Sequence, residues 1–125
     1  MKKKVNSTRL TKKNWSDSNS NSRFTGAENH HISLEEAAVL TKTYRNTHPG
    51  QVIAHFFGKQ AVQAILNQNN CVGIRIYYGQ HPLTGEKHPV MVGVDPDKDD
   101  IYHGYIAERA MSCPSNCGIN NVLNS

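Results

Sequence analysis

Three cysteines are the residues of this chain whose spacing could support chemistry. Cys113 and Cys117 are separated by three residues, which lets two thiolates converge on one metal ion. Cys71 would be a third ligand and a histidine the fourth, and together they would form a closed structural zinc site. The candidate histidines in the predicted sheet region are His81, His88 and His103.

The same cysteines allow two other interpretations. Well-defined zinc motifs contain two close cysteine pairs, whereas this chain has one, which favours ordinary thiols in a terminal loop. A Cys113–Cys117 disulfide bond could form on oxidation, although a redox-active dithiol usually has two intervening residues at the start of a helix. A zinc site at Cys71, Cys113 and Cys117 is therefore one hypothesis beside reduced thiols and a disulfide bond.

No catalytic residue is predicted. The sequence contains no glycine-rich phosphate loop, and spacing alone assembles no Ser/His/Asp or Cys/His set. Asp95, Asp97 and Asp99 have the first spacings of a calcium loop, but Asp100 replaces its glycine and Ile106 its final glutamate. This acidic stretch is instead typical of a solvated turn, and an enzyme is less expected than a binding protein.

A second candidate site lies on a predicted strand at residues 72–78. Its apolar side chains alternate with Arg75 and Tyr77, which share the opposite face. Met91 and Gly93 of the next predicted strand, with His103 of a third, would lie beside them and form a shallow binding surface. The simpler interpretation is a solvated face of an antiparallel sheet.

The surrounding pattern predicts an α+β fold. Ser33 and Glu36 form a capping box that starts a helix ended by residues 48–50, and an apolar stripe at helical spacing predicts a second helix within residues 58–70. Period-two alternation predicts strands at residues 72–78, 90–94 and 101–107, and residues 109–125 are predicted to be irregular. We expect two helices packed on one face of a three-stranded antiparallel meander.

Charge divides the chain into two parts. Residues 1–23 hold seven Lys and Arg and one Asp, a net charge of +6, whereas residues 24–125 hold seven basic and nine acidic residues, a net charge of −2. The Asn-, Ser- and Lys-rich residues 1–29 are predicted to be a disordered arm, and residues 30–125 a single domain. The basic isoelectric point therefore belongs to the arm and not to the domain.

The sequence also predicts a location. It contains no apolar stretch of about 18 residues, as a membrane span requires, so no membrane association is expected. The basic start of the chain is not followed by the apolar segment of a signal peptide. A cytoplasmic location is the prediction, and cysteines are usually reduced in that compartment.

Several segments resemble a family of small uncharacterised bacterial proteins. The resemblance covers residues 32–118 and rests mainly on CVGIRIYY at residues 71–78 and on CPSNC at residues 113–117. Shorter matches lie at residues 32–37, 43–45, 65–68 and 92–95. This resemblance implies a single compact bacterial domain and implies no activity, cofactor or partner.

These observations favour a small non-enzymatic domain that binds a protein or a small ligand. One alternative is weak, non-specific nucleic-acid binding through the basic arm, in which Trp15 would stack on a base. The acidic domain argues against a larger nucleic-acid interface. The other alternative is a structural-zinc or thiol-redox protein that uses Cys113 and Cys117. The sequence does not select an oligomeric state.

Overall fold

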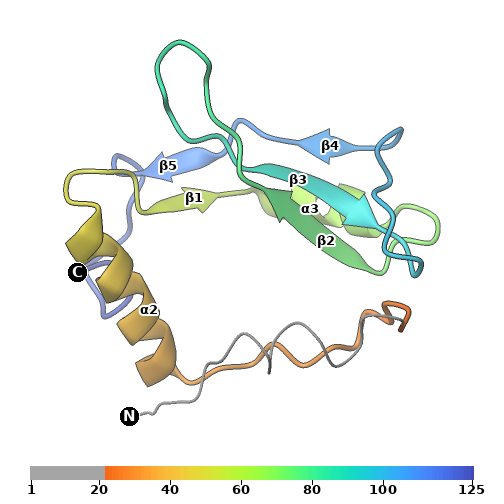
Figure 1. Cartoon of the computed structure of the whole chain (residues 1–125), viewed down its shortest axis with the longest axis horizontal. Helices are drawn as coiled ribbons and strands as arrows, with labels where there is room; N and C mark the ends of the chain where they lie inside the picture. The colour runs from red at the N-terminus through yellow and green to blue at the C-terminus, as the bar shows by residue number, and fades with distance from the viewer. Residues whose placement is uncertain (1–21) are drawn as a thin grey trace.

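The computed structural model describes residues 22–125, and this part of the chain folds into two helices and two antiparallel sheets (Figure 1). The helices are α2 (Leu34–Thr47) and α3 (Lys59–Leu66). The strands are β1 (Ala54–Phe56), β2 (Gly73–Tyr77), β3 (Val90–Val94), β4 (Ile106–Ala107) and β5 (Met111–Cys113). The α+β class and the meander β2-β3-β4 are confirmed.

The core lies between α3 and one face of the meander. Ile65 of α3 is fully buried and clusters with Met91 and Ala107, which lie opposite each other on β3 and β4. Ile74 of β2 packs against this cluster. The helical stripe predicted from the sequence thus covers the sheet, because its apolar side chains can leave water only on that side of α3.

The register of the meander corrects the predicted faces of β3. Ile74 lies opposite Gly93 and Ile76 lies opposite Met91, whereas Arg75 lies opposite Val92. Directly opposed residues of an antiparallel pair share a face, so Met91 and Gly93 face the core and do not lie beside Arg75. Both faces of β3 are apolar, and alternation alone could not tell which of them α3 covers.

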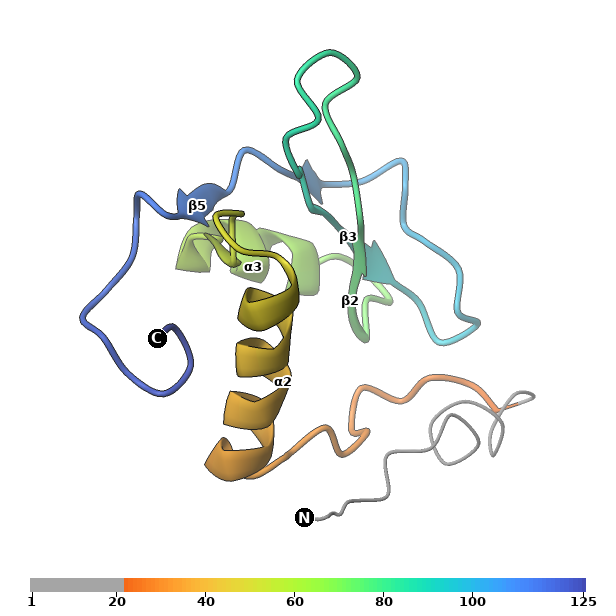
Figure 2. The same ribbon diagram turned by 60° about the vertical axis from the view of Figure 1, so that its left-hand side comes forward.

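The first helix begins as predicted but packs differently. The Glu36 backbone N–H donates to Ser33 Oγ at 3.0 Å, which is the predicted N-cap. However, α2 has no buried residue, and two views show it standing off the three-stranded sheet (Figures 1 and 2). Its Arg45 instead holds the C-terminal segment by donating to Leu123 O at 2.7 Å and to Ser125 O at 2.9 Å.

The sequence prediction missed the second sheet. In this sheet, β1 pairs with β5 so that Ala54 opposes Cys113 and Phe56 opposes Met111. Each strand has only three residues, too few for a period-two pattern to stand out. The predicted strand 101–107 is also shorter than expected, because a turn closed by Gly104 N–H and Ile101 O precedes β4.

Part of the predicted arm lies against the domain. The Phe24 N–H donates to Pro96 O at 2.9 Å, and Arg23 pairs with Asp97 at 3.0 Å. Gly26 has a positive φ of 86°, and a Cβ there would lie 2.8 Å from Val72 O. The predicted boundary at residue 29 therefore falls within a segment that contacts the domain. Residues 1–21, which carry most of the predicted basic arm, lie outside the described residues.

Candidate binding site

The predicted residues Arg75 and Tyr77 do lie close together, but partners within the fold already engage both. Arg75 Nη1 contacts Asp100 Oδ1 at 2.6 Å and donates to Lys98 O at 3.2 Å. The Tyr77 hydroxyl donates to the other oxygen of the same carboxylate. The hydrogen bond from Tyr77, supported by Arg75, lowers the pKa of Asp100, and that bond raises the pKa of Tyr77.

This network has the form of a structural cross-link. It joins the edge strand β2 to the segment that follows β3, above Val92, which is only 3% exposed. The third residue of the predicted binding surface, His103, is exposed. Its ring lies against that of Tyr102, with 4.2 Å between ring centroids. The structure therefore brings Arg75 and Tyr77 together with Asp100, and it places His103 in the turn before β4.

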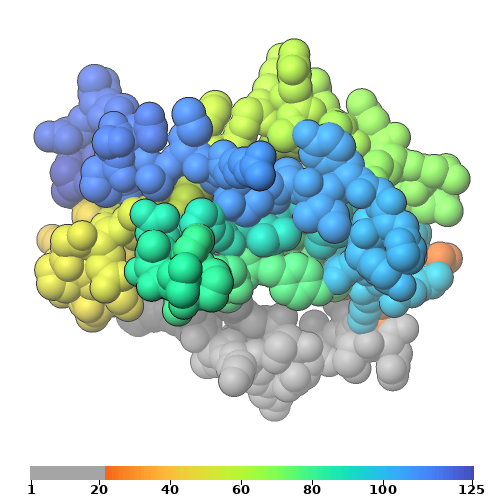
Figure 3. Space-filling model, turned by 90° about the horizontal axis from the view of Figure 1, so that it is seen from above, coloured from red at the N-terminus to blue at the C-terminus, as the bar shows by residue number. Residues whose placement is uncertain are grey.

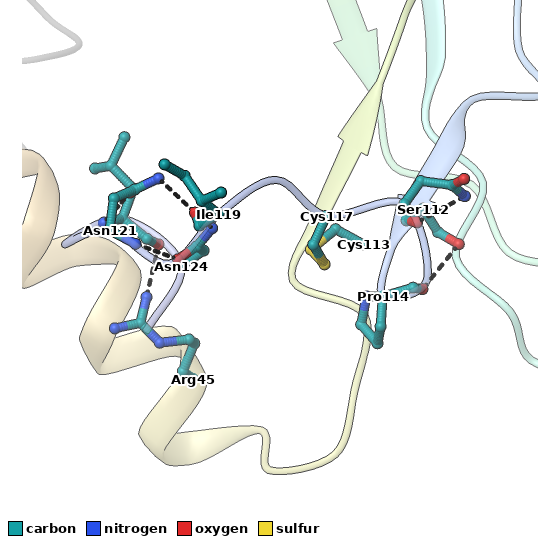
Figure 4. The surroundings of a disulfide bond; sticks show 10 residues. Arg45, Ser112, Cys113, Pro114, Cys117, Ile119, Asn121 and Asn124 are labelled. Atoms are coloured by element: carbon teal, nitrogen blue, oxygen red, sulfur yellow. Dashed lines mark hydrogen bonds between the residues drawn. A yellow bond between two sulfur atoms is a disulfide. The ribbon is translucent and has the colours of Figure 1, made fainter.

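The predicted zinc ligands do not come together. Cys113 and Cys117 form a disulfide bond with their Cα atoms 4.9 Å apart (Figure 4), whereas Cys71 is free and lies near Gly73 O at 3.2 Å. Within residues 22–125, no group of three His, Cys, Asp or Glu side chains is arranged to hold a metal ion. The structure thus gives no support to a zinc site at these cysteines. It shows the alternative, in which Cys113 and Cys117 form a disulfide bond.

A polar hollow of about 470 Å³ lies elsewhere, between the β2–β3 hairpin and the two-stranded sheet. We call it the head pocket. Figure 3 looks down on this face, where the hairpin, the segment after α2 and the segment around β5 meet. Polar and charged side chains from all three segments line it: Gln51, His55, Glu86, Lys87, His88 and Glu108. Its volume falls within the range typical of small-ligand sites.

His88 is the best-defined polar group of the head pocket. Its Nδ1 lies 2.7 Å from Glu108 Oε1, and the second oxygen of Glu108 accepts from the Ala110 N–H at 3.1 Å. His88 Nε2 is buried and has no hydrogen-bond partner, and the Glu86 carboxylate lies 3.6 Å from it. One ring nitrogen is therefore anchored, while the other is unpaired in the wall of the pocket and is a donor in the protonated ring.

The electrostatics favour the protonated form of this imidazole. The hydrogen bond to Glu108 raises the pKa of His88, and the nearby Glu86 acts in the same direction. Burial raises the pKa of Glu108, but the N–H groups of Arg109 and Ala110 together with His88 outweigh burial and lower it below the ordinary glutamate value. The two shifts favour a protonated imidazole paired with an ionised carboxylate.

This pair predicts a pH-dependent stability. Because the folded state raises the pKa of His88, its contribution is complete below pH 6.5, the ordinary histidine value, and is lost as the pH rises through the higher folded value. Glu108 contributes above pH 4.5, and this contribution is lost as the pH falls through its lowered value. The contribution of this pair to stability should therefore be largest between pH 4.5 and pH 6.5, and the midpoint of urea unfolding measures it.

Two variants test the origin of that pH dependence. Glu108→Gln removes the ionised partner, so its urea midpoint should fall less than that of the wild type as the pH rises above 6.5. His103→Gln removes an exposed histidine outside the pocket, and its curve should follow the wild type. Identical pH curves for wild type and Glu108→Gln would contradict the assignment.

Sequence reasoning did not find the head pocket. It named His88 only as a candidate fourth zinc ligand, and it gave no role to Glu108 or His55. The lining residues come from segments near 51–55, 84–88 and 108–112, which no local spacing connects. The available signal was the group of charged or titratable residues at 86–88 in the link between the predicted strands 72–78 and 90–94, since binding residues are common in loops.

Fold and site together define a small α+β domain with a polar pocket beside a disulfide-closed loop. No family model, curated protein or solved structure matches the chain, so the resemblance to small bacterial proteins stays a prediction. Within residues 22–125, neither helix has both the length and the apolar character needed to cross a membrane.

Proposed function

We propose that the chain is a small non-enzymatic binding domain and that its head pocket takes a ligand through an acceptor oxygen. The observation that carries the proposal is His88 Nε2, a buried donor without a hydrogen-bond partner in the wall of a pocket. A buried donor left unpaired costs free energy. A ligand oxygen that accepts from it would recover this cost.

The contacts of the pocket favour binding over catalysis. Both oxygens of Glu108 are engaged, by His88 and by the Ala110 N–H, so this carboxylate orients the imidazole. The hydroxyl of Ser112, which also lines the pocket, donates to Pro114 O at 3.2 Å. A serine nucleophile would instead share its proton with a histidine. The histidine is thus held as a fixed hydrogen-bond donor.

Small anions test this function directly. We expect acetate or inorganic phosphate, added to the full chain near pH 6, to shift the imidazole NMR signals of His88 in a saturable way. His88→Gln should abolish the saturable chemical-shift changes of the neighbouring backbone amides, since glutamine cannot carry the positive charge of the imidazole held by Glu108. His103→Gln should retain it. No saturable shift, or an equal loss in both variants, would refute the proposal.

The partner and location predictions remain proposals beside this one. Binding of a protein partner is part of this proposal, and the alternative of weak nucleic-acid binding through the basic arm and Trp15 rests mainly on residues 1–21, which lie outside the described range. The cytoplasmic location is a prediction from the sequence, as is the bacterial family. The Cys113–Cys117 bond favours an oxidising compartment instead, because disulfide bonds rarely persist in the cytosol.

A further inference from the structure

A second, apolar hollow adjoins the head pocket. This hollow has a volume of about 310 Å³ and lies between α2, β1 and the C-terminal segment. We call it the tail pocket. Three residues line both pockets: Val52, His55 and Lys87. The two pockets are therefore neighbours that meet at these three residues.

The two pockets differ in chemistry. Leu40, Ile53 and Leu123 give the tail pocket an apolar lining, whereas the head pocket holds the His88–Glu108 pair and Glu86. Leu40 is 44% exposed and Leu123 is 42% exposed, so both retain apolar surface that a ligand could cover. Covering such surface is favourable in proportion to its area.

Two hydrogen-bond donors of the head pocket can take further partners. His88 Nε2 has no hydrogen-bond partner. Lys87 Nζ, which can make three hydrogen bonds, donates to Gln51 Oε1 at 2.9 Å. Both oxygens of Glu108 and the Gln51 oxygen already accept. The other carboxylate of the lining, Glu86, lies 3.6 Å from His88 Nε2, so an anionic oxygen that displaced it would meet two donors, His88 Nε2 and Lys87 Nζ.

We infer that the two adjoining pockets together bind a small amphipathic anion that passes between them at their shared residues, with its carboxylate or phosphate head at His88 and Lys87 and its apolar body against Leu40 and Leu123. This inference rests on the proposed function and specifies its ligand class. It accounts for an apolar hollow that shares part of its lining with a pocket in which His88 Nε2 has no hydrogen-bond partner. An uncharged apolar molecule would leave that nitrogen unpaired.

The Glu86 carboxylate lies where the anionic head of the ligand would bind, beside His88 Nε2. It lies 3.6 Å from this nitrogen, too far for a hydrogen bond, and the Glu86 side chain is 73% exposed. It is thus an intramolecular anion that is loosely held and easily displaced. A bound head group would compete with it for His88. Removing its charge should strengthen the binding of an anion and weaken the binding of a cation.

Octanoate, octyl phosphate and octylammonium are the probes, each used as a monomer and titrated calorimetrically into the full chain, with acetate as the short comparison. Burial of one methylene strengthens binding about fourfold, and burial of about three strengthens it roughly 50-fold. Octanoate should therefore bind at least tenfold more tightly than acetate, and octylammonium should bind more weakly than either octyl anion. The ratio of octanoate to octyl phosphate affinity identifies the preferred head.

Variants locate the two halves of the ligand. Glu86→Gln should strengthen octanoate binding by roughly threefold, because a nearby like charge is removed. Leu40→Ser should reduce the advantage of octanoate over acetate and leave acetate binding unchanged. Val39→Ser is the matched control, since Val39 lies on the same helix, is 64% exposed and lines neither pocket.

The outcomes separate this inference from the proposed function. Equal affinities for acetate and octanoate would overturn the amphipathic ligand while the head pocket remained a binding site. Tighter binding of octylammonium, weakened by Glu86→Gln, would overturn the anionic head. Failure of every anion, acetate included, would overturn the proposed function itself. Loss of the chain-length advantage in both Leu40→Ser and Val39→Ser would overturn the placement of the tail.

Discussion

Ile65→Ala should lower the free energy of unfolding by about 2–5 kcal/mol. Ile65 is 0% exposed and is the centre of the cluster that joins α3 to Met91 and Ala107 of the meander. Truncation removes buried apolar surface and leaves a cavity, because β3 and β4 are held in place by their own hydrogen bonds and cannot collapse onto a shortened side chain. Domains of this size are stable by about 5–15 kcal/mol, so the loss is a large fraction of the total.

Urea unfolding followed by far-UV circular dichroism measures this loss. The matched control is Leu66→Ala, the next residue of the same helix, which is 43% exposed. It removes a side chain of the same size, but it should cost about 1 kcal/mol or less because water already covers much of it. Equal losses for the two variants would show that α3 does not bury Ile65 against the sheet.

Cys117→Ser should be the second large effect, with a loss of about 2 kcal/mol under non-reducing conditions. The bond to Cys113 closes a short loop, with a sequence separation of 4, and a bond of this loop length restricts the unfolded chain by about that amount. Cys117 itself is exposed, so the variant removes the bond with little change in packing. The loss should appear in urea unfolding at neutral pH.

Reduction provides the matched comparison. Wild-type protein treated with dithiothreitol should unfold like Cys117→Ser, and the reductant should not destabilise that variant further. Cys71→Ser should keep the response to reductant, because Cys71 is the free thiol. If dithiothreitol left the free energy of unfolding of the wild type unchanged, that result would contradict a disulfide bond. Alkylation of thiols during cell lysis, followed by intact mass, would show whether the bond exists in the cell.

The sequence by itself determined the local elements. The capping box at Ser33 and Glu36 placed the start of α2, and the stripe containing Ile65 placed α3 and its buried face. Alternation placed β2 and β3, and the links between the strands made an antiparallel meander the expected topology. These features depend on neighbours within a few residues, so a single stretch of sequence contains the whole signal.

Tertiary structure decided where long-range partners meet. Which face of β3 lies under α3 depended on the register with β2, since Val92 and Met91 are both apolar and both buried. The pairing of β1 with β5 joins residues more than fifty positions apart, and it brings Ser112 beside His55 in the wall of the head pocket. Such contacts carry no local periodicity, so residues such as Glu108 gain a role only once the chain has folded.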